Sequence, residues 1–217
     1  MSGVKNLAGG AQQVSSRRLL TTLAVAGAVA GFLIVSAYES ATPAIEANRA
    51  ATIDLAIREV LEGVARYEPL YADGESLTTT PPRSGEGHVA PAVYAGVDSG
   101  GRLVGYAITT REPGFQEQIE ILFGVDPRAQ SVIGLAILSS RETPGLGDKI
   151  QGEGWRAQFK GRTAPVVGIK NGGAATPSTV DMITGATISS RAVIGAINHA
   201  MDRWAPLLAK HSQEVRP

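Results

Sequence analysis

The residues best suited to chemistry lie in a short stretch just before the last helical pattern. It reads Asp181-Met182-Ile183-Thr184-Gly185-Ala186-Thr187 and places the Thr187 hydroxyl on a turn of small residues. Backbone N–H groups at a helix start are unpaired and carry partial positive charge, which suits a phosphate. Gly185 and Ala186 would let a large phosphorylated molecule approach the Thr187 oxygen. The alternative is that Thr187 or Ser189 does no more than cap the helix.

A second segment with distinctive turn residues lies earlier in the chain. It reads Ser140-Arg141-Glu142-Thr143-Pro144-Gly145-Leu146-Gly147-Asp148-Lys149. One proline and two glycines predict a tight turn with exposed backbone N–H groups. Such a loop could lie flat against a planar ring and hydrogen-bond its edge. The same residues are also compatible with an ordinary connection from a strand to a helix.

The composition excludes several kinds of site. The chain has 217 residues, no cysteine and a net charge of zero. The lack of cysteine excludes disulfides and thiolate-held zinc or iron–sulfur clusters, so redox chemistry here needs an organic cofactor. The three histidines (His88, His199 and His211) are widely spaced, and we expect them on the surface, with no metal site. Because the charges are balanced and interspersed, we expect no nucleic-acid partner.

An apolar segment near the N-terminus predicts a transmembrane helix over residues 19–37. It carries no charged residue and, at 1.5 Å per residue, would span roughly 28 Å, close to the hydrocarbon thickness of a bilayer. Lys5, Arg17 and Arg18 precede it, whereas Glu39 and Glu46 follow it. The positive-inside rule therefore puts residues 1–18 in the cytoplasm and residues 39–217 on the opposite side.

Two other interpretations of this segment also export the main domain. Val35-Ser36-Ala37 resembles a signal-peptidase site, which would make the segment a cleaved signal. Ser16-Arg17-Arg18-Leu19-Leu20 partly resembles a twin-arginine signal. The side of the membrane on which the main domain lies is therefore predicted more firmly than the way it is anchored.

The remaining patterns predict an α+β domain. Residues 38–91 are expected to be an amphipathic helix over 44–61, starting near Pro43, and a linker that ends in an irregular loop over 73–91. Strands are expected at 92–98, 102–110, 119–125 and 131–139, joined as two hairpins, and again at 164–170. Trp155 and Phe159 indicate a short helix. Residues 188–210 form the closing helix, whose apolar stripe is Ile188, Val193, Ile194, Ile197, Met201, Trp204 and Leu208. We expect a domain over 92–210, an antiparallel sheet packed with helices, and a tail over 211–217.

Together, the two motifs resemble a known pair. Glu142-Thr143-Pro144-Gly145-Leu146-Gly147 followed by Asp-x-x-Thr-Gly-Ala-Thr at 181–187 is similar to the paired hallmark of the FMN-binding domain family. With its single apolar helix and linker, the chain resembles the G subunit of Rnf (Rsx) ion-translocating electron transport complexes. Two alternatives remain: the C subunit of the sodium-pumping NADH:quinone oxidoreductase, and a stand-alone membrane-anchored FMN-binding or sensory module.

The resemblance implies a role for individual residues. Thr187 would carry FMN through a phosphoester bond, installed from FAD and Mg²⁺ by a separate flavin transferase, and Asp181 would serve recognition or the shape of the turn. Lys170 would lie by the flavin or its phosphate, or else be a solvated residue at a strand end. Arg191 would contact the phosphate or lie on the exposed face of the helix. Trp155 and Phe159 would either stack on the ring or belong to the core. The phosphate and ribityl chain would be lined by Thr184, Gly185, Ala186 and Ser189, and the isoalloxazine ring would be contacted by Glu142, Thr143, Leu146 and Gly147.

The resemblance also implies a function and partners. Rnf complexes exchange electrons between NADH and ferredoxin and couple this exchange to ion movement across the bacterial inner membrane. This chain would relay electrons on the extracytoplasmic (periplasmic) side, in contact with other Rnf subunits. No G-x-G-x-x-G fingerprint follows a strand, so we expect no NADH site in this chain. We also expect no catalytic residues, because electron relay requires orientation and tuning of a flavin rather than acid–base chemistry.

Overall fold

The computed structural model describes residues 15–74, 76–81, 92–126, 131–170, 172 and 176–214. The chain divides into two compact units, residues 1–49 and 50–217. Most of helix α1 (Ser16–Val60) lies in the first unit, and its last turns belong to the second. Some expectations lie outside the described residues: those for residues 1–14 with Lys5, His88, the loop over 82–91, the hairpin turn over 127–130 and residues 215–217 of the tail.

Helix α1 is the feature that bears on the membrane. Among the described residues, it is the one helix that is long and apolar enough to cross a bilayer. Its side chains from Leu19 to Val35 are exposed, as expected for a surface that faces lipid. The expectation of a second helix starting near Pro43 was wrong, because α1 continues through this proline. A proline inside a helix removes one hydrogen bond and costs about 3 kcal/mol, which a helix of 45 residues can absorb.

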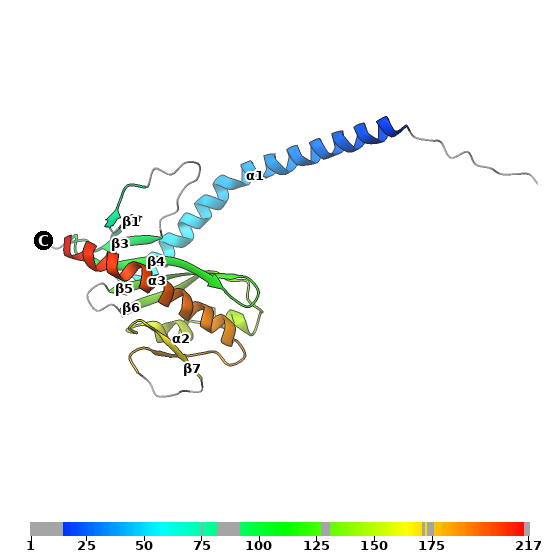
Figure 1. Cartoon of the computed structure of the whole chain (residues 1–217). Helices are drawn as coiled ribbons and strands as arrows, with labels where there is room; N and C mark the ends of the chain where they lie inside the picture. The colour runs from blue at the N-terminus through cyan, green and yellow to red at the C-terminus, as the bar shows by residue number, and fades with distance from the viewer. Residues whose placement is uncertain are drawn as a thin grey trace, which may run out of the picture. The chain divides into compact units, whose positions relative to one another are not determined.

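The second unit is built on a six-stranded sheet whose neighbouring strands are all antiparallel, in the order β2-β1-β3-β4-β5-β6 (Figure 1). The four strands expected between residues 92 and 139 are confirmed. β1 and β2 were not predicted. Pro69 interrupts the pattern of β1, since proline weakens a strand pattern. β2 lies within residues 73–91, which were wrongly expected to be an irregular loop as far as this strand is concerned. The strands are β1 (Arg66–Asp73), β2 (Ser76–Thr78), β3 (Val93–Val97), β4 (Leu103–Pro113), β5 (Gln118–Asp126) and β6 (Ser131–Ser139).

One face of the sheet receives the end of α1. Ile57, Val60 and Leu61 are buried there. Glycines on four neighbouring strands allow this close approach: a methyl group at Gly134 would lie 2.8 Å from the Val60 Cα, and one at Gly96 would lie 2.6 Å from a Leu61 methyl carbon. The four glycines are Gly96, Gly105, Gly124 and Gly134. Side chains at these positions would hold the helix away from the sheet.

The opposite face is covered by helix α3 (Thr187–Glu214), which crosses the sheet in Figure 1. Its predicted apolar stripe is confirmed from Val193 to Leu208, where the side chains pack on β4 and β5 residues such as Ile108 and Phe123. Ile188 is the exception. It was expected in the core, yet 51% of its surface is exposed. Within the first turn of α3, Ile188 lies outside the core, whereas Ser189 and Ser190 are buried.

Short elements connect the sheet to α3. They are η1 (Gly147–Gln151), α2 (Glu153–Arg156), η2 (Ala157–Phe159) and the parallel pair β7 (Val167–Ile169) and β8 (Thr179–Asp181). β7 confirms the strand expected near 164–170, whereas β8 was not predicted because three residues are too few for a pattern. Trp155 and Phe159 are buried in edge-to-face contact with ring centroids 5.0 Å apart, so both belong to the core.

The histidines differ in their environments. His199 is exposed as expected and lies 3.3 Å from Glu112. His211 is less exposed than predicted, because its Nδ1 lies 2.7 Å from the hydroxyl of the fully buried Tyr106. Burial raises the pKa of Tyr106, and a buried phenol needs a hydrogen-bond partner. Within the described residues no three His, Asp or Glu side chains converge in a way that could hold a metal ion.

Candidate functional site

A pocket of about 340 Å³ brings the two sequence motifs together. Its size falls at the lower end of the range for small-molecule sites. One wall comes from the loop after β6, another from the first turn of α3, and Phe115 closes it from the β4–β5 turn. The lining residues are Phe115, Glu142, Thr143, Leu146, Gly147, Gly185, Ala186, Thr187, Ile188 and Ser189.

Thr187 is positioned by a tight turn that leads into α3. The Ala186 N–H donates to the Ile183 carbonyl at 3.0 Å, and Gly185 between them has φ +85°. This is the pattern of a type II turn, which requires positive φ at its third residue and therefore favours glycine. The buried Ser190 hydroxyl holds the turn from behind, since it accepts from Ile183 N–H at 3.0 Å and donates to the Ala186 carbonyl at 2.9 Å.

Thr187 is the first residue of α3 and is partly exposed to the pocket. No hydrogen bond among the described residues takes up the backbone N–H groups of Thr187, Ile188 or Ser189, or the Thr187 hydroxyl. The first N–H groups of a helix lack partners within the helix and bear partial positive charge. The turn thus presents a hydroxyl oxygen and several N–H donors on one side of the pocket, an arrangement that fits a phosphate group.

The loop from the first motif forms a similar turn on the facing wall. The Leu146 N–H donates to the Thr143 carbonyl at 3.1 Å, with Pro144 and Gly145 between them and φ +76° at Gly145. Pro followed by Gly at these positions is the preferred sequence of a type II turn. The two turns approach each other, because a methyl group at Gly185 would lie 3.4 Å from a Leu146 methyl carbon.

Glu142 connects all three walls of the pocket. Its side chain is only 6% exposed. One carboxylate oxygen accepts the N–H groups of Phe115 and Gln116 at 2.9 and 3.1 Å, and the other accepts the Ser189 hydroxyl at 2.5 Å. These three donors offset the free-energy cost of burying the carboxylate away from water. Glu142 thus links the three walls of the pocket, a structural role that was not predicted.

Two glycines enclose the Glu142 carboxylate. A methyl group at Gly147 would lie 2.8 Å from Glu142 Oε2 and 2.9 Å from the Ser189 hydroxyl, and one at Gly114 would lie 2.5 Å from Glu142 Oε1. Neither separation is tolerated by a real side chain without movement of its neighbours. Gly147 was predicted as a ring contact, and its position explains why only glycine fits there.

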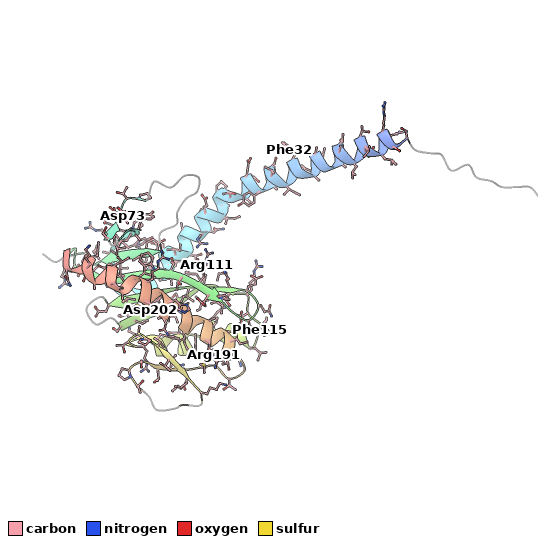
Figure 2. The ribbon with its side chains drawn as sticks, in the orientation of Figure 1. Phe32, Asp73, Arg111, Phe115, Arg191 and Asp202 are labelled. Carbon is pink, nitrogen blue, oxygen red and sulfur yellow. The ribbon has the colours of Figure 1, made fainter. Side chains whose placement is uncertain are left out.

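Three large apolar side chains around the pocket are unusually exposed. Phe115, Leu146 and Ile188 have 65%, 48% and 51% of their surface accessible. Figure 2 shows Phe115 at the end of the domain where α3 begins. Phe115 and Ile188 were not predicted as site residues. The missed signal for Phe115 was an aromatic residue directly after Pro113-Gly114. Ile188 was assigned to the apolar stripe of the helix instead.

Other predicted site residues do not line the pocket. Thr184 is exposed on the turn, and Lys170 is exposed just after β7. Asp181 lies on the far side of the turn: its carboxylate accepts the Gly172 N–H at 3.0 Å, and its carbonyl accepts the Trp155 ring N–H at 2.8 Å. These contacts hold the chain in place just before Thr184. Ser189, by contrast, belongs to the pocket lining, but it is buried and its hydroxyl is directed to Glu142.

Comparison with known proteins gives the family. Residues 114–202 match the FMN-binding domain family, a range that contains the whole pocket lining. The G subunit of the ion-translocating oxidoreductase complex of Methanosarcina acetivorans is 31% identical over 186 residues, which cover 85% of this chain and 92% of the relative. The chain belongs to the G-subunit family of ion-translocating oxidoreductase complexes. The G subunit of the Na⁺-translocating ferredoxin:NAD⁺ oxidoreductase complex of Acetobacterium woodii is 32% identical, and the match covers 75% of this chain and 79% of that one.

A solved structure supports the fold of this G subunit. The C subunit of the Na⁺-translocating NADH-quinone reductase of Parabacteroides distasonis has a TM-score of 0.53 and 19% identity, and the match covers 67% of this chain and 78% of that one. At this identity the likeness concerns the fold alone. The sequence relatives therefore favour the G subunit over the quinone reductase subunit and over a stand-alone module.

Family membership and structure agree on the broad assignment. The chain is a subunit of a redox-driven, ion-translocating complex and carries an FMN-binding domain. Its N-terminal apolar helix marks it as membrane-anchored.

Proposed function

We propose that this G subunit relays electrons through an FMN joined covalently to Thr187, within an Rnf-type complex that exchanges electrons between NADH and ferredoxin and couples this to ion translocation. The observation that carries the proposal is the Thr187 hydroxyl at the first residue of α3, inside a pocket and beside unpaired helix N–H groups. The other subunits of the complex are the expected partners. The chain itself needs only to hold and orient the cofactor.

The residues of the pocket fit the two chemically different parts of FMN. The N–H groups of Ile188 and Ser189 suit the phosphate, next to the attachment oxygen. Phe115, Leu146 and the Ile188 side chain suit the apolar faces of the ring, which would in turn cover side chains that are otherwise half exposed. The loop over 143–147 supplies backbone groups for the polar edge of the ring.

Attachment requires FAD as co-substrate and a separate flavin transferase with Mg²⁺. The Thr187 Oγ1 forms a new bond to the phosphorus on the FMN side of FAD, the phosphoanhydride bond of FAD breaks, and AMP leaves. The hydroxyl proton is released, and the product is a phosphodiester with one negative charge. Gly185 and Ala186 matter at this step because a phosphorus atom must come within bonding distance of a hydroxyl on a turn with little side-chain bulk.

A covalent bond suits a flavin that works outside the cytoplasm. Bound FMN supplies one- and two-electron transfer, which allows it to connect one-electron carriers. The bond removes the dissociation equilibrium, so the cofactor is not lost by dilution. It also restricts the ring to the neighbourhood of the pocket, where Glu142 and the two turns determine its surroundings.

Intact-mass spectrometry of the full chain tests the proposal. The protein is produced with a flavin transferase and, in parallel, without one. We expect the mass to rise by one FMN minus one water only in the first sample, and fragmentation to place the addition on Thr187. An unmodified mass for the protein purified from its own membranes would contradict the proposal.

Arg191 is expected to stabilise the phosphate of the bound flavin. It lies four residues after Thr187 on α3, and side chains on a helix lean toward the N-terminus, so the guanidinium can reach back over Thr187. Arg191 is exposed and has no salt bridge within the described residues (Figure 2). In a Thr187→Val background, which prevents attachment, we expect Arg191→Gln to weaken FMN binding by about ten-fold. Riboflavin binding should not change, and fluorescence titration measures both.

The comparison of FMN with riboflavin separates a phosphate contact from a general defect. Arg111, which is exposed on β4 and does not line the pocket, provides the control variant Arg111→Gln. An equal loss for both flavins in Arg191→Gln would indicate a disturbed pocket, and an unchanged FMN affinity would exclude the contact.

We further propose that residues 61–217 lie on the extracytoplasmic side of the membrane. Support comes from Arg17 and Arg18 directly before the apolar segment, and from Glu39 and Glu46 after it. Protease added to intact spheroplasts should digest the domain and leave a short fragment that contains residues 1–37. Protection of the domain until the membrane is permeabilised would reverse this orientation.

A further inference from the structure

We infer that the buried Glu142 carboxylate sets the reduction potential of the flavin, acting as a fixed negative charge in the wall of the pocket. This inference rests on the proposed function, because it requires a flavin in this pocket. It goes beyond that function by assigning a residue that controls the redox property of the cofactor. Glu142 itself undergoes no chemical change during electron transfer.

The position of Glu142 is fixed by contacts from three elements. Phe115 N–H and Gln116 N–H hold one oxygen, the Ser189 hydroxyl holds the other, and Gly114 and Gly147 close the remaining space around the carboxylate. Such a group cannot turn toward solvent without breaking three hydrogen bonds. The donors therefore occupy both oxygens, with two backbone N–H groups on Oε1 and the Ser189 hydroxyl on Oε2.

Burial makes this charge effective at the pocket. Glu142 is 6% exposed and contributes to the lining of the pocket. Water would therefore screen its charge only weakly from a ring bound in the pocket. The interaction between charges is several-fold stronger in such an environment than in water. Reduction adds electron density to a flavin, and a nearby negative charge disfavours the electron-rich form. Glu142 should therefore lower the reduction potential of the flavin. The three hydrogen-bond donors reduce this effect because they withdraw electron density from the carboxylate oxygens.

The balance between charge and donors predicts opposite effects for two variants. Glu142→Gln removes the charge but keeps an oxygen for the Phe115 and Gln116 N–H groups, so the flavin potential should rise. Ser189→Ala keeps the charge and removes one donor, so the carboxylate becomes more electron-rich and the potential should fall. A purely structural role has no reason to give shifts of opposite sign.

Spectroelectrochemical titration of the full flavinylated chain in detergent measures these shifts. Glu117→Gln is the matched control: it removes a nearby charge of the same sign, but Glu117 is exposed, pairs with Arg141 and does not line the pocket. We expect no shift for the control at high salt, because solvent ions screen exposed charges. The Glu142→Gln shift should persist at high salt.

The inference is overturned if Glu142→Gln leaves the potential unchanged, or if Glu142→Gln and Ser189→Ala shift it in the same direction. If Glu142→Gln accepts no flavin, the flavin potential of Ser189→Ala is the test. An unchanged or higher potential in that variant contradicts the inference. Failure of the proposed function is recognised separately by mass, as wild-type protein without attached FMN. The same potentials measured with free FMN bound to the purified chain then still test Glu142.

Discussion

Replacement of Thr187 by alanine should abolish covalent flavin attachment. The Thr187 hydroxyl is the only oxygen that the structure places both at the first residue of α3 and free in the pocket, within the described part of the chain. Ser189 cannot substitute, since its buried hydroxyl is held by Glu142 at 2.5 Å. We expect in-gel flavin fluorescence to fall to background and the mass to equal that of the bare polypeptide. Thermal stability of the flavin-free protein should hardly change, because the lost hydroxyl has no partner.

Two further variants define the specificity of this result. Thr187→Ser retains a hydroxyl at the same place and should retain flavin, with a reduced yield because serine explores more rotamers. Thr184→Ala removes the exposed hydroxyl of the same turn and should keep full attachment. Fluorescence that survives in Thr187→Ala, or that is lost in Thr184→Ala, would show that the linkage lies elsewhere.

Replacement of Gly147 by alanine should both destabilise the domain and reduce flavin loading. The new methyl group would lie 2.8 Å from the Glu142 Cβ and Oε2, so Glu142 must move or the loop must withdraw. Overpacking of this kind costs about 1–3 kcal/mol of unfolding free energy. Because Glu142 connects the loop, the β4–β5 turn and α3, its displacement would also change the pocket. Urea unfolding and in-gel fluorescence measure the two effects.

Gly154 provides the matched control for this steric argument. It lies in α2, and a methyl group there would meet nothing within 4 Å. Gly154→Ala should leave flavin loading intact and leave stability unchanged or raised by a few tenths of a kcal/mol, as alanine is the better helix former. Equal losses in both variants would point to a general sensitivity to glycine replacement rather than to contact with Glu142.

The local elements were largely predictable because their signals are local. Apolar runs on either side of turn residues predicted the strands β3 to β6, and the apolar stripe predicted α3 from Val193 onward. The turn at Ile183–Ala186 was visible in Thr184-Gly185-Ala186, since a glycine is needed where φ is +85°. β1 was missed because Pro69 interrupts its pattern. Its pairing with β3 joins segments that are distant in the sequence, so no local signal indicates it. Pro43 predicted a helix boundary that does not exist. Proline often marks the start of a helix, but here the residues on both sides of it favour helix and α1 continues through it.

The sequence by itself determined which residues could carry a phosphorylated cofactor: the hydroxyl on a small turn at a helix start, and the Pro-Gly loop that precedes it. Only the tertiary structure decided what surrounds them. Phe115 and Ile188 became pocket residues, Asp181 and Lys170 fell outside the lining, and Glu142 became a buried charge shared by three walls. The physical reason is that turn and helix signals depend on neighbours along the chain. Burial and charge environment, by contrast, depend on segments that meet only after the sheet has formed.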